Sequence, residues 1–199
     1  MPQRIKGAIE HRIMQPLTAA ATNKRFDTDY YVEGYATTFE QPYLLFEFGG
    51  QKYYERISKD ALVGADMSDV IMQYNHSGKV LARQSNQTLG LEVDTHGLFV
   101  CADLSKSRAA KELHEEINSG LVTKMSWGFT IKEESFNKET LTWTILRIGK
   151  VYDVSAVSIP ANDNTEISVR SRLDEIKAMQ SITRQRAIDI LNFKIKTGG

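Results

Sequence analysis

A serine in a short alternating segment is the first candidate for chemistry in this chain. Read as a β-strand, residues 125–131 place bulky apolar side chains on one face and Ser126, Gly128 and Thr130 on the other. Because Gly128 has no side chain, a second chain or a substrate could approach beside Ser126. A hydroxyl held in this way is a candidate nucleophile, although an ordinary solvent-facing serine would give the same pattern.

His76 is the candidate general base. It follows the apolar run 70–74 almost directly, and active-site residues often lie where a rigid strand gives way to a loop. The alternative is a histidine that only satisfies the backbone groups of the turn. The other histidines are weaker candidates: His11 is expected to be exposed in a polar arm, His96 lies in a predicted hairpin turn, and His114 falls on the solvated face of a predicted helix.

Asp153 is the third unusual position. It lies in the run 151–159, which is apolar on both faces and therefore predicts a strand buried on both sides. A buried carboxylate is costly unless it is paired or hydrogen-bonded, so we expect a partner for it. A histidine that the carboxylate orients would fit, and so would backbone amides or an arginine such as Arg147.

The sequence has no recognisable metal-binding or phosphate-binding motif. It lacks paired cysteines, His-Glu-x-x-His, a calcium loop and a phosphate-cradling glycine loop. Gly-x-Ser-x-Gly is also absent, which argues against the nucleophile elbow of the α/β-hydrolases. We therefore predict no metal and no other cofactor, and a serine hydrolase here would need its nucleophile on a strand.

Composition narrows the class of protein. The 199 residues suffice for one domain with appendages or for two small domains. The 25 basic and 25 acidic side chains give a formal net charge of zero, which argues against nucleic acid as a partner. No apolar run approaches the ~18–20 residues of a membrane span, and the N-terminus shows no secretory signal. The single cysteine, Cys101, excludes an internal disulfide, so we expect a reducing compartment, the cytoplasm.

Strand patterns dominate the chain. Aromatic and β-branched runs between turn signals predict strands at 30–36, 44–48, 52–56, 70–74, 81–83, 88–93, 97–102, 125–132, 141–148 and 151–159. From Ser105 the apolar spacing becomes helical, and Gly120 is placed to end that helix. We predict a mainly β protein with helices (α+β), in which a mostly antiparallel barrel or sandwich has a few helices around it.

Changes in composition divide the chain into three parts. Residues 1–27 are polar and poorly periodic, which predicts an N-terminal arm or a leading strand. Residues 28–170 contain the predicted strands and form the main domain. Residues 171–199 have apolar residues at helical spacing, which predicts a C-terminal helical tail of one broken helix or two short ones.

Four segments in this order carry a resemblance to a known family. They are Tyr74–His76 after an apolar strand, the helix end at 117–121, the run 124–129, and the run 153–162. Their order and spacing resemble the prohead, or capsid maturation, serine proteases of tailed bacteriophages. Residues 32–36 are also similar to that family's first strand, and the resemblance covers residues 28–170.

The resemblance implies a fold and an activity. The family is related in fold to the herpesvirus assemblin proteases, which implies a closed β-barrel ringed by helices. It implies a serine endopeptidase inside the immature capsid, or prohead, in the host cytoplasm. Its partners would be the scaffold protein or the major capsid protein, whose scaffold-like segment it would cut before cutting itself. Self-association would be compatible with this role. The tail at 171–199 would either pack on the barrel or target the scaffold and be removed by self-cleavage.

The resemblance also assigns roles to residues. By position, Ser126 matches the nucleophile, His76 the general base, and Asp153 the third member, where glutamate is common in the family. The assemblins use a second histidine as third member, which keeps His114 and His96 as outside candidates.

Two further positions complete the expected site. Gly128 would leave room for an extended substrate beside the nucleophile, and Arg147 is a weak candidate for assisting oxyanion stabilisation.

Two other classes of function remain open from the sequence. One is a non-catalytic capsid assembly or scaffold component on the same fold. The other is a nucleic-acid-binding barrel, for which the only hint is the run Lys52–Arg56, where aromatic and basic residues are interleaved.

Overall fold

The computed structural model describes residues 8–19, 23–158, 173, 176–186 and 188–190. Strands make up most of this part of the chain, which confirms the mainly β prediction. The elements in chain order are β1 (Ile9–Thr18), β2 (Tyr31–Thr38), β3 (Tyr43–Phe48), β4 (Gln51–Ile57), β5 (Ile71–Tyr74), β6 (Ser77–Arg83), β7 (Leu89–Val93), β8 (Gly97–Asp103), the short 3-10 helix η1 (Leu104–Lys106), α1 (Arg108–Asn118), β9 (Lys124–Asn137) and β10 (Thr142–Val157).

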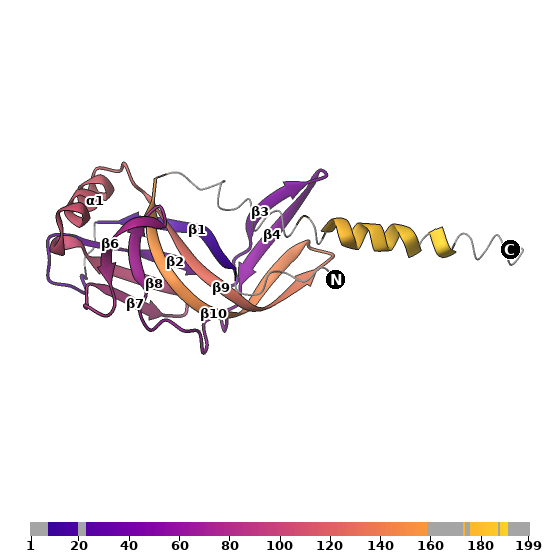
Figure 1. The fold of residues 1–199 in the computed structure, drawn as a ribbon, viewed down its shortest axis with the longest axis horizontal. Coiled ribbons are helices and arrows are strands. Elements are labelled where there is room, and N and C mark those ends of the chain that lie inside the picture. Colours follow the sequence, from indigo (N-terminus) through magenta and orange to yellow (C-terminus); the bar gives the residue numbers. More distant parts are fainter. Residues whose placement is uncertain (1–7, 20–22, 159–172, 174–175, 187, 191–199) are drawn as a thin grey trace, which may run out of the picture.

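The strands form one strongly curled sheet, in which β10 is the central element (Figure 1). The order is β3-β4-β10-β9-β1-β2-β8-β7, and β5 with β6 extends the sheet from β10. β4 pairs in parallel with the first part of β10 and β5 in parallel with its last part, whereas the other pairs are antiparallel. Among the described residues no ladder joins β6 to β7, so the closed barrel stays a prediction.

β1 is an integral strand of the sheet. It pairs along β9 and, at its end, with β2, so residues 9–18 of the expected N-terminal arm lie within the main domain. One bulge, between Ile13 and Pro16, interrupts the pairing with β9. Because β1 lies beside β9, the strand that carries Ser126, its side chains can contribute to the same site.

The predicted central helix is confirmed as α1. Its start is capped by the Ser107 hydroxyl, which accepts a hydrogen bond from the Ala110 amide at 3.1 Å. Ala110, Leu113 and Ile117 form its buried face, and Gly120 follows the end of the helix with a positive φ of 78°. This face packs into the main hydrophobic core, which the curled sheet encloses.

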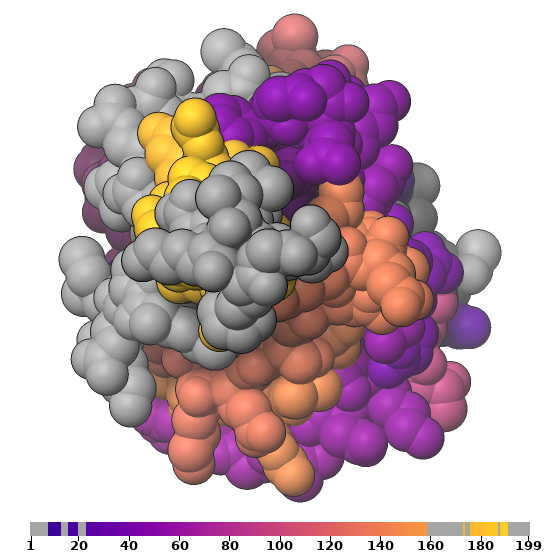
Figure 2. Space-filling model, turned by 90° about the vertical axis from the view of Figure 1, so that its right-hand side faces the viewer, coloured from indigo at the N-terminus to yellow at the C-terminus, as the bar shows by residue number. Residues whose placement is uncertain are grey.

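The C-terminal helix packs at the opposite end of the molecule from α1 (Figure 1). Its described residues are 173, 176–186 and 188–190, and Ile176 is buried against Tyr53 and Trp143 in a second, smaller core. Met179 and Thr183 of this helix line a hollow together with Tyr53 of β4 and Phe136 of β9, at the end of the molecule that faces the viewer in Figure 2. Within the predicted tail at 171–199, the residues that the structure describes are helical. No described helix is long and apolar enough to span a membrane.

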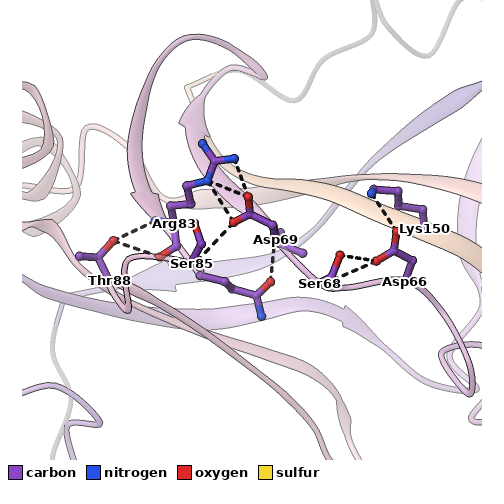
Figure 3. A network of polar contacts seen from close by, with 9 residues as sticks. Asp66, Ser68, Asp69, Arg83, Ser85, Thr88 and Lys150 are labelled. Carbon is purple, nitrogen blue, oxygen red and sulfur yellow. Dashed lines mark hydrogen bonds and ion pairs between the residues drawn. The ribbon is translucent and has the colours of Figure 1, made fainter.

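Two ion pairs fasten the loop that leads into β5 (Figure 3). Asp66 binds Lys150 of β10 at 2.8 Å, and Asp69 binds Arg83 of β6 through both carboxylate oxygens. The Arg83 hydrogen bonds lower the pKa of Asp69 to about 2. These contacts fix the base of the β5–β6 hairpin, whose tip carries His76.

Candidate active site

Three residues from different parts of the sheet meet in one chain of contacts. Ser126 Oγ lies 2.6 Å from His76 Nε2, and His76 Nδ1 lies 2.5 Å from Asp153 Oδ2. These are the three residues that the sequence analysis selected. Because an ionised carboxylate only accepts hydrogen bonds, the proton of the neutral imidazole lies on Nδ1, and Nε2 is free to accept from the Ser126 hydroxyl.

Strand register explains why Ser126 and Asp153 are neighbours. In the antiparallel β9–β10 ladder Ser155 stands opposite Ser126, and Asp153 stands opposite Gly128. All four therefore project from the same face of the sheet, with Asp153 diagonally next to Ser126. Two long, hydrogen-bonded strands thus fix the nucleophile and the carboxylate relative to each other.

The β5–β6 turn brings His76 over this pair. β5 lies on the other side of β10, and the chain reverses at Asn75 and His76, which both adopt positive φ values of 50° and 55°. The Asn75 amide donates to the Ala156 carbonyl at 2.9 Å, and the Asn75 side chain also bonds Ser158. These bonds anchor the turn to β10 at the position that His76 requires.

The side chains of Ser126, His76 and Asp153 are largely buried. The Ser126 residue is 1% exposed, and the side chains of His76 and Asp153 are 5% and 9% exposed. The buried carboxylate is satisfied by the histidine and by the Ser155 hydroxyl, which donates to Asp153 Oδ2 at 2.7 Å. In such a water-poor site an ionised Asp153 stabilises a positive charge on His76 more than it would in water.

His11 is a site residue that the sequence analysis placed wrongly. It was expected to be exposed, but its side chain is only 23% exposed on β1, where it stands opposite Gly128. Its ring lies against that of His76, with centroids 3.9 Å apart, and His11 Nε2 lies 3.9 Å from Asp153 Oδ1. Burial and the nearby His76 both lower the pKa of His11, against the opposing effect of Asp153.

Gly128 has a different role from the one predicted. The space beside it is filled by the protein's own side chains, so it does not leave room for a substrate. A Cβ at this position would overlap Asp153 Oδ1 and would come within 3.1 Å of the His11 ring. Glycine is therefore needed here because it lets Asp153 and His11 approach across the strand.

Replacing Gly128 by alanine should lower kcat by about 100-fold, because displacing a catalytic group by about 1 Å has effects of this size. Peptide cleavage and thermal unfolding would be measured together. Gly149→Ala in β10 is the matched control, since its added Cβ would meet only the Thr130 side chain closely, at 3.1 Å from Oγ1. A fully active Gly128→Ala protein would show that the Asp153 position is not critical.

Arg147 lies outside the centre. Its side chain is exposed, donates to the Val63 carbonyl at 3.3 Å, and precedes Asp153 on β10 by roughly 20 Å of strand. It is thus neither the partner of Asp153 nor an aid to oxyanion stabilisation, and that prediction is wrong. His96 and His114 also lie elsewhere, each with its ring edge-on to a tyrosine. The second histidine of this centre is His11.

A buried ion cluster on the other face of β1 holds that strand in place. Arg12 donates to both carboxylate oxygens of Glu55 in β4, at 2.5 and 3.0 Å, and to Glu10 at 3.1 Å. Tyr43 also donates to Glu55. Burial alone lowers the pKa of Arg12, but the charge and hydrogen bonds of Glu55 more than offset it and keep that pKa well above its ordinary value.

Comparison with known proteins adds one match. A sequence model described as caudovirus prohead serine protease matches residues 18–181, which include all three members of the Ser126–His76–Asp153 chain. No curated protein and no solved structure matches the chain. The match begins at Thr18, the last residue of β1, so His11 and Arg12 precede the matched residues.

Proposed function

This chain belongs to the caudovirus prohead serine protease family, and on that premise we propose that it is a serine endopeptidase of capsid maturation. The observation that carries the proposal is the unbroken contact from Ser126 Oγ through His76 to Asp153. Nucleophile, base and orienting group stand within hydrogen-bond reach in the order that acyl transfer requires.

The proposed mechanism assigns one step to each group. His76 Nε2 takes the proton of the Ser126 hydroxyl as Oγ attacks the carbonyl carbon of the scissile peptide bond. Asp153 keeps the imidazole oriented and stabilises its positive form, and His76 then gives the proton to the leaving amine. Water, activated by the same imidazole, hydrolyses the acyl-enzyme and regenerates Ser126.

Access to Ser126 requires a local rearrangement. At 1% exposure, its Oγ cannot meet a peptide until a neighbouring segment moves. This supports a protease that opens when its substrate, enclosed with it in the prohead, binds. Opening on substrate binding is a common way to keep catalysis and water apart.

The proposed substrates are capsid components. We propose that the enzyme cuts the scaffold protein, or the scaffold-like segment of the major capsid protein, and then itself, at its C-terminal helical tail. The support is membership in a family of prohead proteases, since enclosure in a prohead together with its substrate would give a high effective concentration. Self-association on the capsid wall would be compatible with this arrangement.

We also propose that the curled sheet is a form of the closed barrel of the herpesvirus assemblins. The support is the single continuous sheet, the helix α1 over its core, and a serine nucleophile on a strand. An experimental structure in which β6 and β7 are bridged would establish closure.

Co-expression with the cognate major capsid protein tests the function. The wild-type chain should shorten the capsid protein, whereas Ser126→Ala should leave it at full length. Ser135→Ala is the matched control, because it removes an exposed hydroxyl from the same strand. Shortening by the Ser126→Ala protein would overturn the assignment, and mass spectrometry of the chain from mature particles would show whether residues 171–199 are removed.

A second candidate function is a non-catalytic capsid assembly component, which the burial of Ser126 favours. A fluorophosphonate probe separates the two, because it bonds only to a serine that an imidazole activates. Labelling of wild-type protein in assembling proheads, absent in Ser126→Ala, would exclude the non-catalytic reading. Complete absence of labelling there would support it.

A further inference from the structure

One group in the centre has no part in the proposed mechanism. One ring nitrogen of His11, one of His76 and an Asp153 carboxylate oxygen all lie within 4.8 Å of one another. They come from β1, the β5–β6 turn and β10, which are far apart in the sequence, so no short metal-binding motif contains them. The prediction of no metal rested on the absence of such motifs. Two imidazoles and one carboxylate form a donor set that suits zinc and leaves a fourth position open.

We propose that His11, His76 and Asp153 form an inhibitory site for Zn²⁺ or a similar transition-metal ion. The inhibition rests on the proposed function, because its target is the catalytic base. The binding does not, because it needs only the three ligands. Calcium and magnesium are poor candidates, since these ions prefer oxygen ligands to imidazole.

The distances require modest movement. In a tetrahedral zinc site the ligand atoms lie about 2.0 Å from the metal and hence about 3.3 Å from one another. His11 Nε2 and Asp153 Oδ1, at 3.9 Å, need to approach by about 0.6 Å. Because His76 contacts the other oxygen of Asp153, the carboxylate must also rotate or bind the metal through both oxygens. His76 Nδ1 and Asp153 Oδ2, at 2.5 Å, must separate by about 1 Å, so the metal replaces their hydrogen bond.

The surroundings suit a bound metal. The partly exposed His11 side chain gives an ion a path from solvent. Ser155 already donates to Asp153, and Ser126 Oγ lies at the second nitrogen of His76. Such outer hydrogen bonds fix ligand orientation in metal sites.

Metal binding would remove the base by reversing its tautomer. In the free enzyme the imidazole proton lies on Nδ1, and Nε2 accepts from Ser126. A metal on Nδ1 needs that lone pair, so the proton passes through solvent to Nε2 and none is gained or lost. Nε2–H then donates to Ser126 Oγ and cannot take its proton. The nucleophile is thereby left without a base.

Binding is tested first, in a protein that cannot cleave. Calorimetric titration of the full-length Ser126→Ala chain with ZnCl₂ should give one site per chain, and Co²⁺ should give the visible absorption of tetrahedral coordination. Adding His11→Phe should weaken binding by at least about tenfold, as loss of a ligand weakens it no less than loss of an outer contact. His96→Phe, in the exposed β7–β8 turn, is the matched control and should change nothing. His11→Gln replaces His11→Phe if thermal unfolding shows that the latter is misfolded.

Inhibition is tested second, with each variant's rate divided by its own rate without metal. Zn²⁺ should inhibit wild-type peptide cleavage, EDTA should restore it, and His11→Phe should raise the inhibitory concentration at least tenfold, in step with its binding loss. Zn²⁺ affinity that ignores His11 would overturn the site. Binding without inhibition would overturn its regulatory role. Binding that depends on His11 in a chain that cleaves nothing would overturn the proposed function and leave the metal site standing.

Discussion

Replacing Ser126 by alanine should lower kcat by about 10⁴–10⁶-fold and leave the melting temperature nearly unchanged. In the proposed mechanism the Oγ atom forms the covalent bond to substrate, so no other group can supply this step, whereas the lost hydrogen bond to His76 contributes little to folding. The assay is cleavage of a peptide that spans the capsid-protein junction. His76→Ala should cause a similar loss, and the double variant should be no worse than either, because the two residues act as one unit.

Asp153→Asn should lower kcat less than Ser126→Ala does. The amide keeps the shape of the carboxylate but not its charge, so the loss should be smaller, on the order of 10²–10⁴-fold. Ser135→Ala should keep full activity. A Ser126→Ala protein with more than a few per cent of the wild-type rate would mean that another residue is the nucleophile.

Replacing Arg12 by methionine should lower the free energy of unfolding by about 3–5 kcal/mol. Arg12 is 4% exposed and Glu55 fully buried, so the substitution removes a cation that is bonded directly to a buried carboxylate. Urea unfolding followed by tryptophan fluorescence would measure the change. Restoring neutrality with Arg12→Met and Glu55→Gln together should recover part of the loss, since an amide is easier to bury than a carboxylate.

Arg108→Met is the matched control for this effect. Arg108 forms an exposed pair with Glu112 on α1, and such pairs contribute only about 0.3–0.5 kcal/mol. If Arg12→Met cost no more than this control, the buried cluster would not be what anchors β1. Activity should fall together with stability in Arg12→Met, because His11 and the β9 edge depend on the same strand.

The three residues that meet in the centre could be selected from the sequence because each has a local signature. Ser126 stands out on an alternating strand, His76 at a strand end, and Asp153 in a doubly apolar run. His11 has almost none. His11 lies two residues from both Ile9 and Ile13, which is a weak strand signal. Only the pairing of β1 with the distant strand β9 places it beside Asp153. Register between remote strands is set by the whole sheet, which a single sequence does not reveal.

The same limit explains the errors at Gly128 and in β10. A glycine in a strand signals a close approach, but the sequence does not say whether a substrate or the protein's own side chains approach. Residues 141–148 and 151–159 were predicted as two strands with a break near Gly149. Residues 142–157 instead form one strand, β10, because register shifts between Ile145 and Asp153 absorb the irregularity without ending the ladder. The parallel pairing of β4 and β5 with β10 has no local signal at all.

The late position of β10 in the chain has a consequence for biosynthesis. β4, β5 and β9 all pair with β10, so ribosomal synthesis must deliver the last of these four strands before the sheet can form. At about 5–20 residues per second, a nascent chain therefore carries Ser126 and His76 on the order of seconds before Asp153 exists to orient them. Because strands that are distant in the sequence pair with each other, the proposed peptidase activity can begin only when nearly the whole domain has been translated.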